Sequence, residues 1–303
     1  MPPSKNVSLL RALLEEADAL ASRTAKSEFP VLLRPIAERR RVTSVEFCPL
    51  LVDAMLTTHP NGFRILFNSN GAIPSVLQER YKNESREQIM TSRLRFSLAH
   101  ELAHTFFYDL SAAQPRVAKQ FASGGGRTAL ENLERNCNKL ASHLLLPTLM
   151  LKAEFLRLKV INPESILGLA RKAGVSVEVL VRRLSENNSL FIKRYFPGCV
   201  ILANQSPDEI TIRAIAKPQN LNIARDLYRM RSGGCWQLKA HDGSDIRPAS
   251  LPPISSAILT VETQGTVCQK RYNIAVAKAG QFDSVISYLI TFEEVEPSKV
   301  SSN

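Results

Sequence analysis

Residues Arg95–Phe107, RFSLAHELAHTFF, contain the H-E-x-x-H motif formed by His100, Glu101 and His104. On an α-helix, positions four residues apart lie about 40° apart around the axis, so both imidazoles can reach one metal ion. Glu101 would lie beside the open coordination position, where its carboxylate can accept a proton from water. Seven of the other residues are apolar and lie nearly all round the helix, which is typical of a helix buried in a core: Phe96, Leu98, Ala99, Leu102, Ala103, Phe106 and Phe107. The stretch therefore predicts a buried, metal-binding helix.

A structural alternative exists for the same residues. The two histidines and the glutamate could merely satisfy one another's hydrogen bonds inside a core. A buried glutamate without a metal or another cation is costly, however, and this disfavours the alternative.

A third ligand is expected on a second helix, because a catalytic zinc site takes three protein ligands and keeps one position for water. Residues 131–146 precede Pro147 and repeat apolar residues at helical spacing. Glu134 lies within the same narrow arc as this apolar face, so it is our favoured ligand. Glu131, one turn earlier, is the competing candidate, although an acid there also complements the helix dipole. Asn138 could orient a ligand or the water without touching the metal.

The combined pattern resembles the ImmA/IrrE metallopeptidases. Members of that family carry a motif close to R-F-T-L-A-H-E-x-G-H, followed by E-x-x-(A/C)-N-x-F-A-x-x-L-L-x-P. This chain has RFSLAHELAH at residues 95–104, then Glu134-x-x-Cys137-Asn138 and a run that ends at Pro147. Specific matching covers about residues 60–150. Three small departures leave the candidate ligands untouched: Ser97, Ala103 and Leu140.

By this resemblance, His100, His104 and Glu134 correspond to the metal ligands and Glu101 to the general base. The resemblance implies a zincin-like metallopeptidase domain of the gluzincin type. It also implies one Zn²⁺ per chain, although the sequence does not separate Zn²⁺ from Mn²⁺ or Fe²⁺. In characterised relatives the substrate is a helix-turn-helix transcriptional repressor. In gluzincins an edge strand binds extended peptide, and Gly62–Asn68 is our candidate for that strand.

Composition favours an intracellular protein of more than one domain. A chain of 303 residues corresponds to two domains at about 150 residues each. The sequence has no 18-residue apolar run, so no membrane span is expected. The N-terminal amphipathic segment lacks the apolar region of a secretion signal. Five scattered cysteines, never in C-x-x-C, indicate reduced thiols in a cytoplasmic protein.

The spacing of apolar residues and the change from expected helices to expected strands divide the α+β chain into four parts. Residues 1–150 form the zincin-like metallopeptidase domain, with helices near 6–22, 31–40 and 74–90. Residues 151–195 form a helical segment that resembles a helix-turn-helix. Residues 196–295 form a small α+β domain with five strands and a helix at 221–231. Residues 296–303 form a disordered tail. Glycines in the segment 114–126 would permit a mobile lid.

The helical segment raises the question of DNA binding. Residues 151–195 carry a net charge of +5 out of +11 for the chain, and Arg182 and Arg183 could meet phosphates. The structural alternative is that this helical pair completes the peptidase domain. Some IrrE-like members also carry a GAF-like sensor domain after this region, so the resemblance implies such a domain at 196–295.

We therefore predict a metal-dependent endopeptidase that cleaves a repressor protein as a regulatory switch. The alternative is a DNA-binding regulator whose metal site is structural. An intact Glu101 argues against the alternative, because structural sites more often close with four Cys or His ligands.

Overall fold

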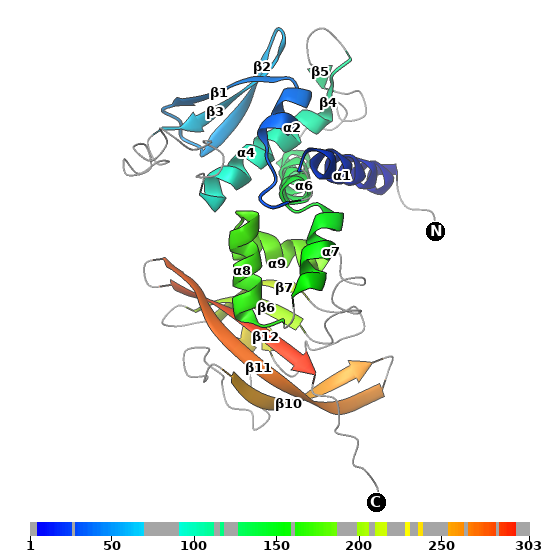
Figure 1. Cartoon of the computed structure of the whole chain (residues 1–303), viewed down its shortest axis with the longest axis vertical. Coiled ribbons are helices and arrows are strands. Elements are labelled where there is room, and N and C mark those ends of the chain that lie inside the picture. Colours follow the sequence, from blue (N-terminus) through cyan, green and yellow to red (C-terminus); the bar gives the residue numbers. More distant parts are fainter. Residues whose placement is uncertain are drawn as a thin grey trace, which may run out of the picture. The chain divides into compact units, whose positions relative to one another are not determined.

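The structure, a computed structural model, describes most of the chain. The described residues are 5–25, 28–69, 91–111, 116–117, 127–158, 161–186, 199–205, 210–216, 228–230, 236–238, 254–263, 266–282 and 285–294. They form helices and sheets in mixed order, which confirms the predicted α+β class (Figure 1). The zincin-like and GAF-like details stay predictions. The expected helix 74–90, the glycines of the expected lid and the tail 296–303 lie outside the described residues.

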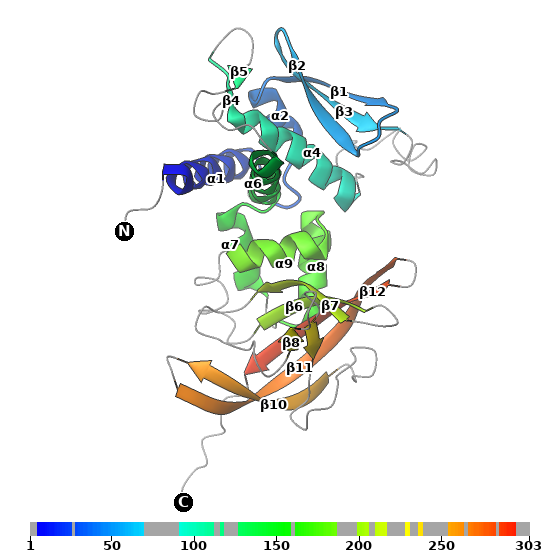
Figure 2. The same ribbon diagram turned by 180° about the vertical axis from the view of Figure 1, so that it is seen from behind.

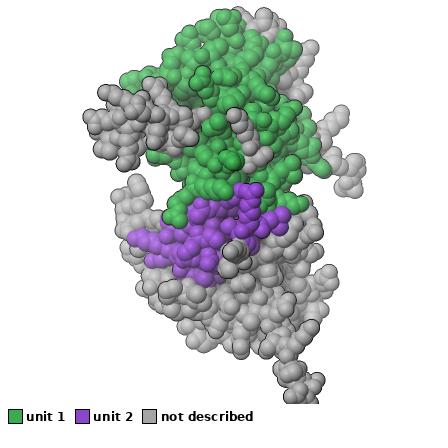
Figure 3. All heavy atoms as spheres, viewed as in Figure 1, with its two compact units in different colours: residues 1–153, 171–176 green, residues 154–170, 177–303 purple. Residues whose placement is uncertain are grey.

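The chain divides into two compact units (Figure 3). The first comprises residues 1–153 and 171–176, and the second comprises residues 154–170 and 177–303. The finer boundaries expected at 150, 195 and 295 stay predictions.

The first unit combines a small sheet with helices. Its elements are α1 (Lys5–Thr24), α2 (Arg34–Arg39), β1 (Val42–Cys48), β2 (Ala54–His59), β3 (Gly62–Asn68), α4 (Ser92–His104), the 3-10 helix η1 (Thr105–Phe107), β4 (Tyr108–Asp109), β5 (Arg116–Val117) and α6 (Arg127–Leu145). Helix α7 (Thr148–Arg157) begins in this unit and ends in the second. Figures 1 and 2 both show α4 between the three-stranded sheet and α6.

The sheet has the order β1-β3-β2, with β1 parallel and β2 antiparallel to β3. Phe63, Ile65 and Phe67 alternate along β3 and are fully buried, so one face of the sheet packs on the core. The hairpin from β2 to β3 turns tightly at Gly62. A Cβ there would lie 2.0 Å from the carbonyl oxygen of Arg41, so only glycine fits.

Both ends of α4 are anchored by polar side chains. At its start, the Thr91 hydroxyl accepts a hydrogen bond from the Leu94 N–H, as an N-cap does. At its end, the Arg40 guanidinium donates to the hydroxyl and the carbonyl of Thr105, at 3.1 and 2.6 Å. The same guanidinium lies 4.1 Å from the centre of the Phe106 ring. Because Thr105 follows His104 directly, these bonds fix the end of the helix that carries the histidines.

Arg95 ties α4 to a distant turn. Its side chain is 2% exposed and donates to the carbonyls of Gly174 and Val31, at 3.2 and 2.9 Å. Gly174 follows the end of helix α8 (Pro163–Ala173), where helix carbonyls carry partial negative charge and favour a cation. The arginine that opens the RFSLAHELAH motif thus has a structural role.

A second polar contact joins α1, α6 and α7. The Asp18 carboxylate lies 3.1 Å from His143 Nδ1 and accepts hydrogen bonds from the backbone N–H and the hydroxyl of Thr148. Asp18 therefore caps the first turn of α7 from another helix. This contact holds the C-terminal end of α6, the helix that carries Glu134.

The second unit contains a five-stranded antiparallel sheet in the order β10-β11-β12-β6-β7. Its strands are β6 (Cys199–Gln205), β7 (Ile210–Ala216), β10 (Ile254–Thr263), β11 (Thr266–Phe282) and β12 (Val285–Glu294), beside the separate pair β8 (Tyr228–Met230) and β9 (Trp236–Leu238). Helix α9 (Val177–Glu186) packs on β6 and β7. The five predicted strands are thus confirmed. The helix expected at 221–231 is wrong at residues 228–230, which form β8, and residues 221–227 lie outside the described part.

Among the described residues, no helix is both long enough and apolar enough to cross a membrane.

Gly174 and Gly168 allow a matched test of the backbone conformation at and just after α8. At Gly174 the φ angle is +65° and an added Cβ would lie 2.9 Å from Arg95 Nε, whereas a Cβ at Gly168 of α8 meets nothing within 4 Å. We expect Gly174→Ala to lower the free energy of unfolding by about 1–2 kcal/mol, because left-handed backbone disfavours a side chain. Gly168→Ala should raise it by about 0.5–1 kcal/mol, because alanine favours the helix. Urea denaturation followed by circular dichroism measures both, and equal effects of the two changes would contradict the description.

Candidate metal centre

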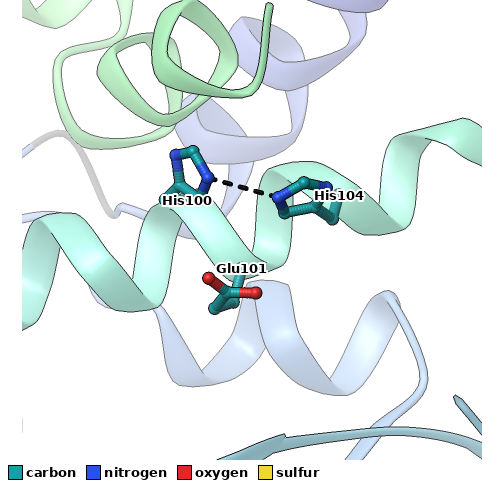
Figure 4. A group of neighbouring side chains, drawn as sticks. All are labelled: His100, Glu101 and His104. Carbon is teal, nitrogen blue, oxygen red and sulfur yellow. Dashed lines mark hydrogen bonds between the residues drawn. The ribbon is translucent and has the colours of Figure 1, made fainter. Parts of the chain in front are cut away.

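The two histidines of α4 face each other. His100 Nε2 and His104 Nε2 lie 3.2 Å apart, and the two rings are mostly buried. Figure 4 shows the imidazoles turned toward one another. Glu101 leaves the same helix in a different direction. One possible ligand atom from each of these three residues lies within 4.8 Å of the others.

Helix α6 brings a carboxylate to the same point. Glu134 Oε2 lies 3.0 Å from His100 Nε2, and Glu134 Oε1 lies 3.6 Å from His104 Nε2. The competing candidate, Glu131, is 3.8 Å from Arg135 on the exposed surface of α6. The geometry therefore favours Glu134 as the third ligand.

These three donors fit a tetrahedral metal ion. Bonds of about 2.0–2.1 Å from zinc to nitrogen and oxygen place two tetrahedral ligands about 3.3 Å apart. The separations of 3.0, 3.2 and 3.6 Å bracket that value. Two imidazole nitrogens and a carboxylate oxygen are also the donor types of catalytic zinc sites.

Consecutive residues of α6 contact the outer nitrogens of the two rings. Asn138 Oδ1 lies 3.0 Å from His100 Nδ1, and Cys137 Sγ lies 3.4 Å from His104 Nδ1. Asn138 thus contacts the Nδ1 side of His100, whereas Glu134 lies on the Nε2 side of the same ring. From the sequence alone, Cys137 is one of the apolar residues at helical spacing in residues 131–146. Burial raises the pKa of the Cys137 thiol, which favours its neutral form.

Burial also shifts the ionisation of Glu101 and His104. Burial raises the pKa of the Glu101 carboxyl, whereas the charge of His100 and a hydrogen bond from the Leu56 backbone N–H lower that pKa. For His104, burial and the neighbouring His100 lower the pKa, and this favours the neutral imidazole that a metal requires.

The strand beside the candidate site is β2. Strand β3 is central and pairs with β1 and β2 on its two sides, so our expectation that Gly62–Asn68 is the peptide-binding edge strand is wrong. In the described part of the chain, β2 has only β3 as a strand neighbour and contacts α4. Because the Leu56 N–H reaches Glu101, it points away from β3. Alternation along the strand then directs the backbone groups of Ala54 and Thr58 outward as well.

The two arginines expected to meet phosphates differ in exposure. Arg183 is fully buried. Arg182 donates twice to one carboxylate oxygen of Glu178, at 3.0 and 2.8 Å. Arg183 is therefore enclosed, whereas the side chain of Arg182 is 57% exposed, so DNA binding by this segment stays a prediction.

Comparison with known proteins extends these observations. Residues 87–185 match the family described as the IrrE N-terminal-like domain, Peptidase_M78. This segment is similar to an IrrE N-terminal-like domain. The match confirms the predicted relationship to the ImmA/IrrE metallopeptidases, and a comparison with curated proteins found no match.

The position of the match adds two points. The IrrE N-terminal-like domain spans α4 and α6, so both helices of the candidate centre lie inside it. It also spans α8 and nearly all of α9, the two helices of the segment expected to resemble a helix-turn-helix. The family supports a metallopeptidase-type function, and a peptidase implies a protein substrate.

The ligand assignment predicts which variants lose metal. His100→Ala, His104→Ala and Glu134→Gln should each lose tightly bound metal, because each removes one of three converging donors. Glu131→Gln, a matched change one turn away on α6, should keep it. Metal content per chain after desalting is the measurement. Loss of metal in Glu131→Gln with retention in Glu134→Gln would show that the assignment is wrong.

Proposed function

We propose that this protein is a zinc-dependent endopeptidase. The observation that carries the proposal is the convergence of His100, His104 and Glu134 at separations suited to one metal ion, with Glu101 beside them. The donor set suits Zn²⁺, although Mn²⁺ or Fe²⁺ could occupy the same ligands. When bound, the metal ion would polarise the peptide carbonyl and make a water molecule more acidic.

The chain's own residues would move the proton. Glu101 accepts a proton from the attacking water and then donates it to the leaving amine, so one carboxylate serves as base and acid in turn. The Leu56 N–H holds this carboxylate at the edge of the sheet. Asn138 accepts the Nδ1–H of His100, which leaves the Nε2 lone pair of that ring directed at the metal.

The exposed edge of β2 would hold the substrate. Strand pairing binds an extended segment through backbone hydrogen bonds and is tolerant of side-chain identity. The outward backbone groups of Ala54 and Thr58, on either side of the Leu56 N–H that bonds Glu101, lie on the strand that contacts α4. A peptide paired there would run past Glu101 in an extended form, so the substrate bond should lie in an exposed or locally unfolded segment.

The substrate we propose is a helix-turn-helix transcriptional repressor. This step rests on the similarity to the ImmA/IrrE family, in which cleavage of such a repressor acts as a regulatory switch. One cut in an exposed segment would inactivate the repressor, so the enzyme would control transcription through proteolysis and not through DNA binding of its own.

The variant Glu101→Gln separates catalysis from binding. The change is nearly isosteric and removes only the basic carboxylate, so the variant should keep its fold, its metal and its partner. It should cleave that partner at least about 10²-fold more slowly, the scale of losing a general base. A pull-down with this variant from cells should enrich the uncut substrate, whose cleavage by the wild-type protein is then measured by gel electrophoresis.

The matched control is Glu46→Gln, an exposed glutamate of β1 that accepts a hydrogen bond from Ser44. It should cleave like the wild-type protein. Undiminished cleavage by metal-loaded Glu101→Gln would contradict the mechanism, and loss of metal from that variant would make Glu101 a ligand instead.

A further inference from the structure

The outer nitrogen of His104 faces a buried thiol. Cys137 Sγ lies 3.4 Å from His104 Nδ1, within hydrogen-bonding distance for sulfur, and Cys137 is fully buried. The next residue of α6, Asn138, makes the equivalent contact with His100 Nδ1. Two consecutive residues of one helix thus contact the outer nitrogens of both candidate ligands.

The thiol is not placed to be a ligand itself. The two nitrogens of an imidazole ring point in different directions, and the other donors gather on the Nε2 side of His104. Cys137 Sγ lies on the Nδ1 side, so the ring separates it from the point where those donors converge. Cys137 Sγ therefore contacts the candidate ligand His104 and does not belong to the set of converging donors.

We propose that Cys137 is a positioning residue for His104. The Nδ1–H of His104 donates to Sγ, and this bond holds the tautomer and the ring orientation in which the Nε2 lone pair is directed at the metal. Without this acceptor, a buried N–H would lose its partner, which is costly. The inference rests on the proposed function, because it assigns a role toward the same metal.

The test compares two substitutions of nearly equal size. Cys137→Ser keeps an acceptor at this position, whereas Cys137→Ala removes it, so the difference between them isolates the hydrogen bond from the loss of volume. Zn²⁺ affinity of the full chain, measured by competition with a chelator, should fall about 10-fold or more in Cys137→Ala, the usual scale for partners that orient a ligand. Cys137→Ser should retain most of the affinity.

A spectroscopic measurement separates orientation from packing. In the zinc-loaded protein, the Nδ1–H proton of His104 should give a downfield, slowly exchanging NMR signal that persists in Cys137→Ser. That signal should move upfield and exchange faster in Cys137→Ala, while the Nδ1–H signal of His100 stays in place because its partner is Asn138. If Cys137→Ala does not fold, Cys137→Val, which fills the space without an acceptor, replaces it.

Two controls guard against general effects. Cys48→Ala removes a thiol from β1, and Ser142→Ala removes a buried hydroxyl of α6 that bonds to the Lys139 carbonyl. Both should bind Zn²⁺ like the wild-type chain. Wild-type affinity in Cys137→Ala or Cys137→Val would overturn the inference, and so would equal weakening in Cys137→Ser and Cys137→Ala. A wild-type chain that binds no Zn²⁺ would instead overturn the proposed function and this inference together.

Discussion

The candidate centre depends on how closely α4 and α6 approach each other. One helix supplies two imidazoles a turn apart, and the other supplies a carboxylate, so the three donors meet only if both helices are held in position. Several contacts serve that end. Arg40 fixes the last turn of α4 through Thr105, and Arg95 ties the same helix to a distant turn. Asp18 holds the end of α6 through His143.

The resulting arrangement brings together atoms that repel each other unless something positive lies between them. Two imidazole nitrogens with inward lone pairs cannot face each other at 3.2 Å without a shared proton or a cation. The partial burial of both rings strengthens this constraint, because water solvates them less well than at the surface. Metal binding would satisfy all three donors at once. A shared proton joins only two of these atoms, so the geometry favours a metal centre over a self-satisfied cluster.

Patterns within single helices could be predicted from the sequence. Helical spacing located α4, α6, α8 and α9, and one H-E-x-x-H motif located the candidate site. Arg183 was misjudged, because a charged residue is usually exposed. Its position three residues after Leu180 on α9 places it near the buried face, and the structure buries it fully.

Relations between distant segments could not be predicted in the same way. Whether β3 is central or at an edge depends on pairing with β1 and β2, and no local pattern contains that information. An Asn-Gly pair beside a strand is a hairpin signal, however, so Asn61-Gly62 could have located β2. The contact of Arg95 with Gly174 joins residues 79 positions apart. The contact between Cys137 and His104 likewise depends on how two helices pack.

X-ray absorption at the zinc edge, on the full chain loaded with one equivalent of Zn²⁺, would identify the atoms that surround the bound metal. We predict a first shell of nitrogen and oxygen only, at about 2.0–2.1 Å, with the scattering pattern of two imidazoles. A sulfur neighbour at about 2.3 Å would contradict the account, because it would make a cysteine a ligand. A first shell with fewer than two imidazoles would contradict it as well.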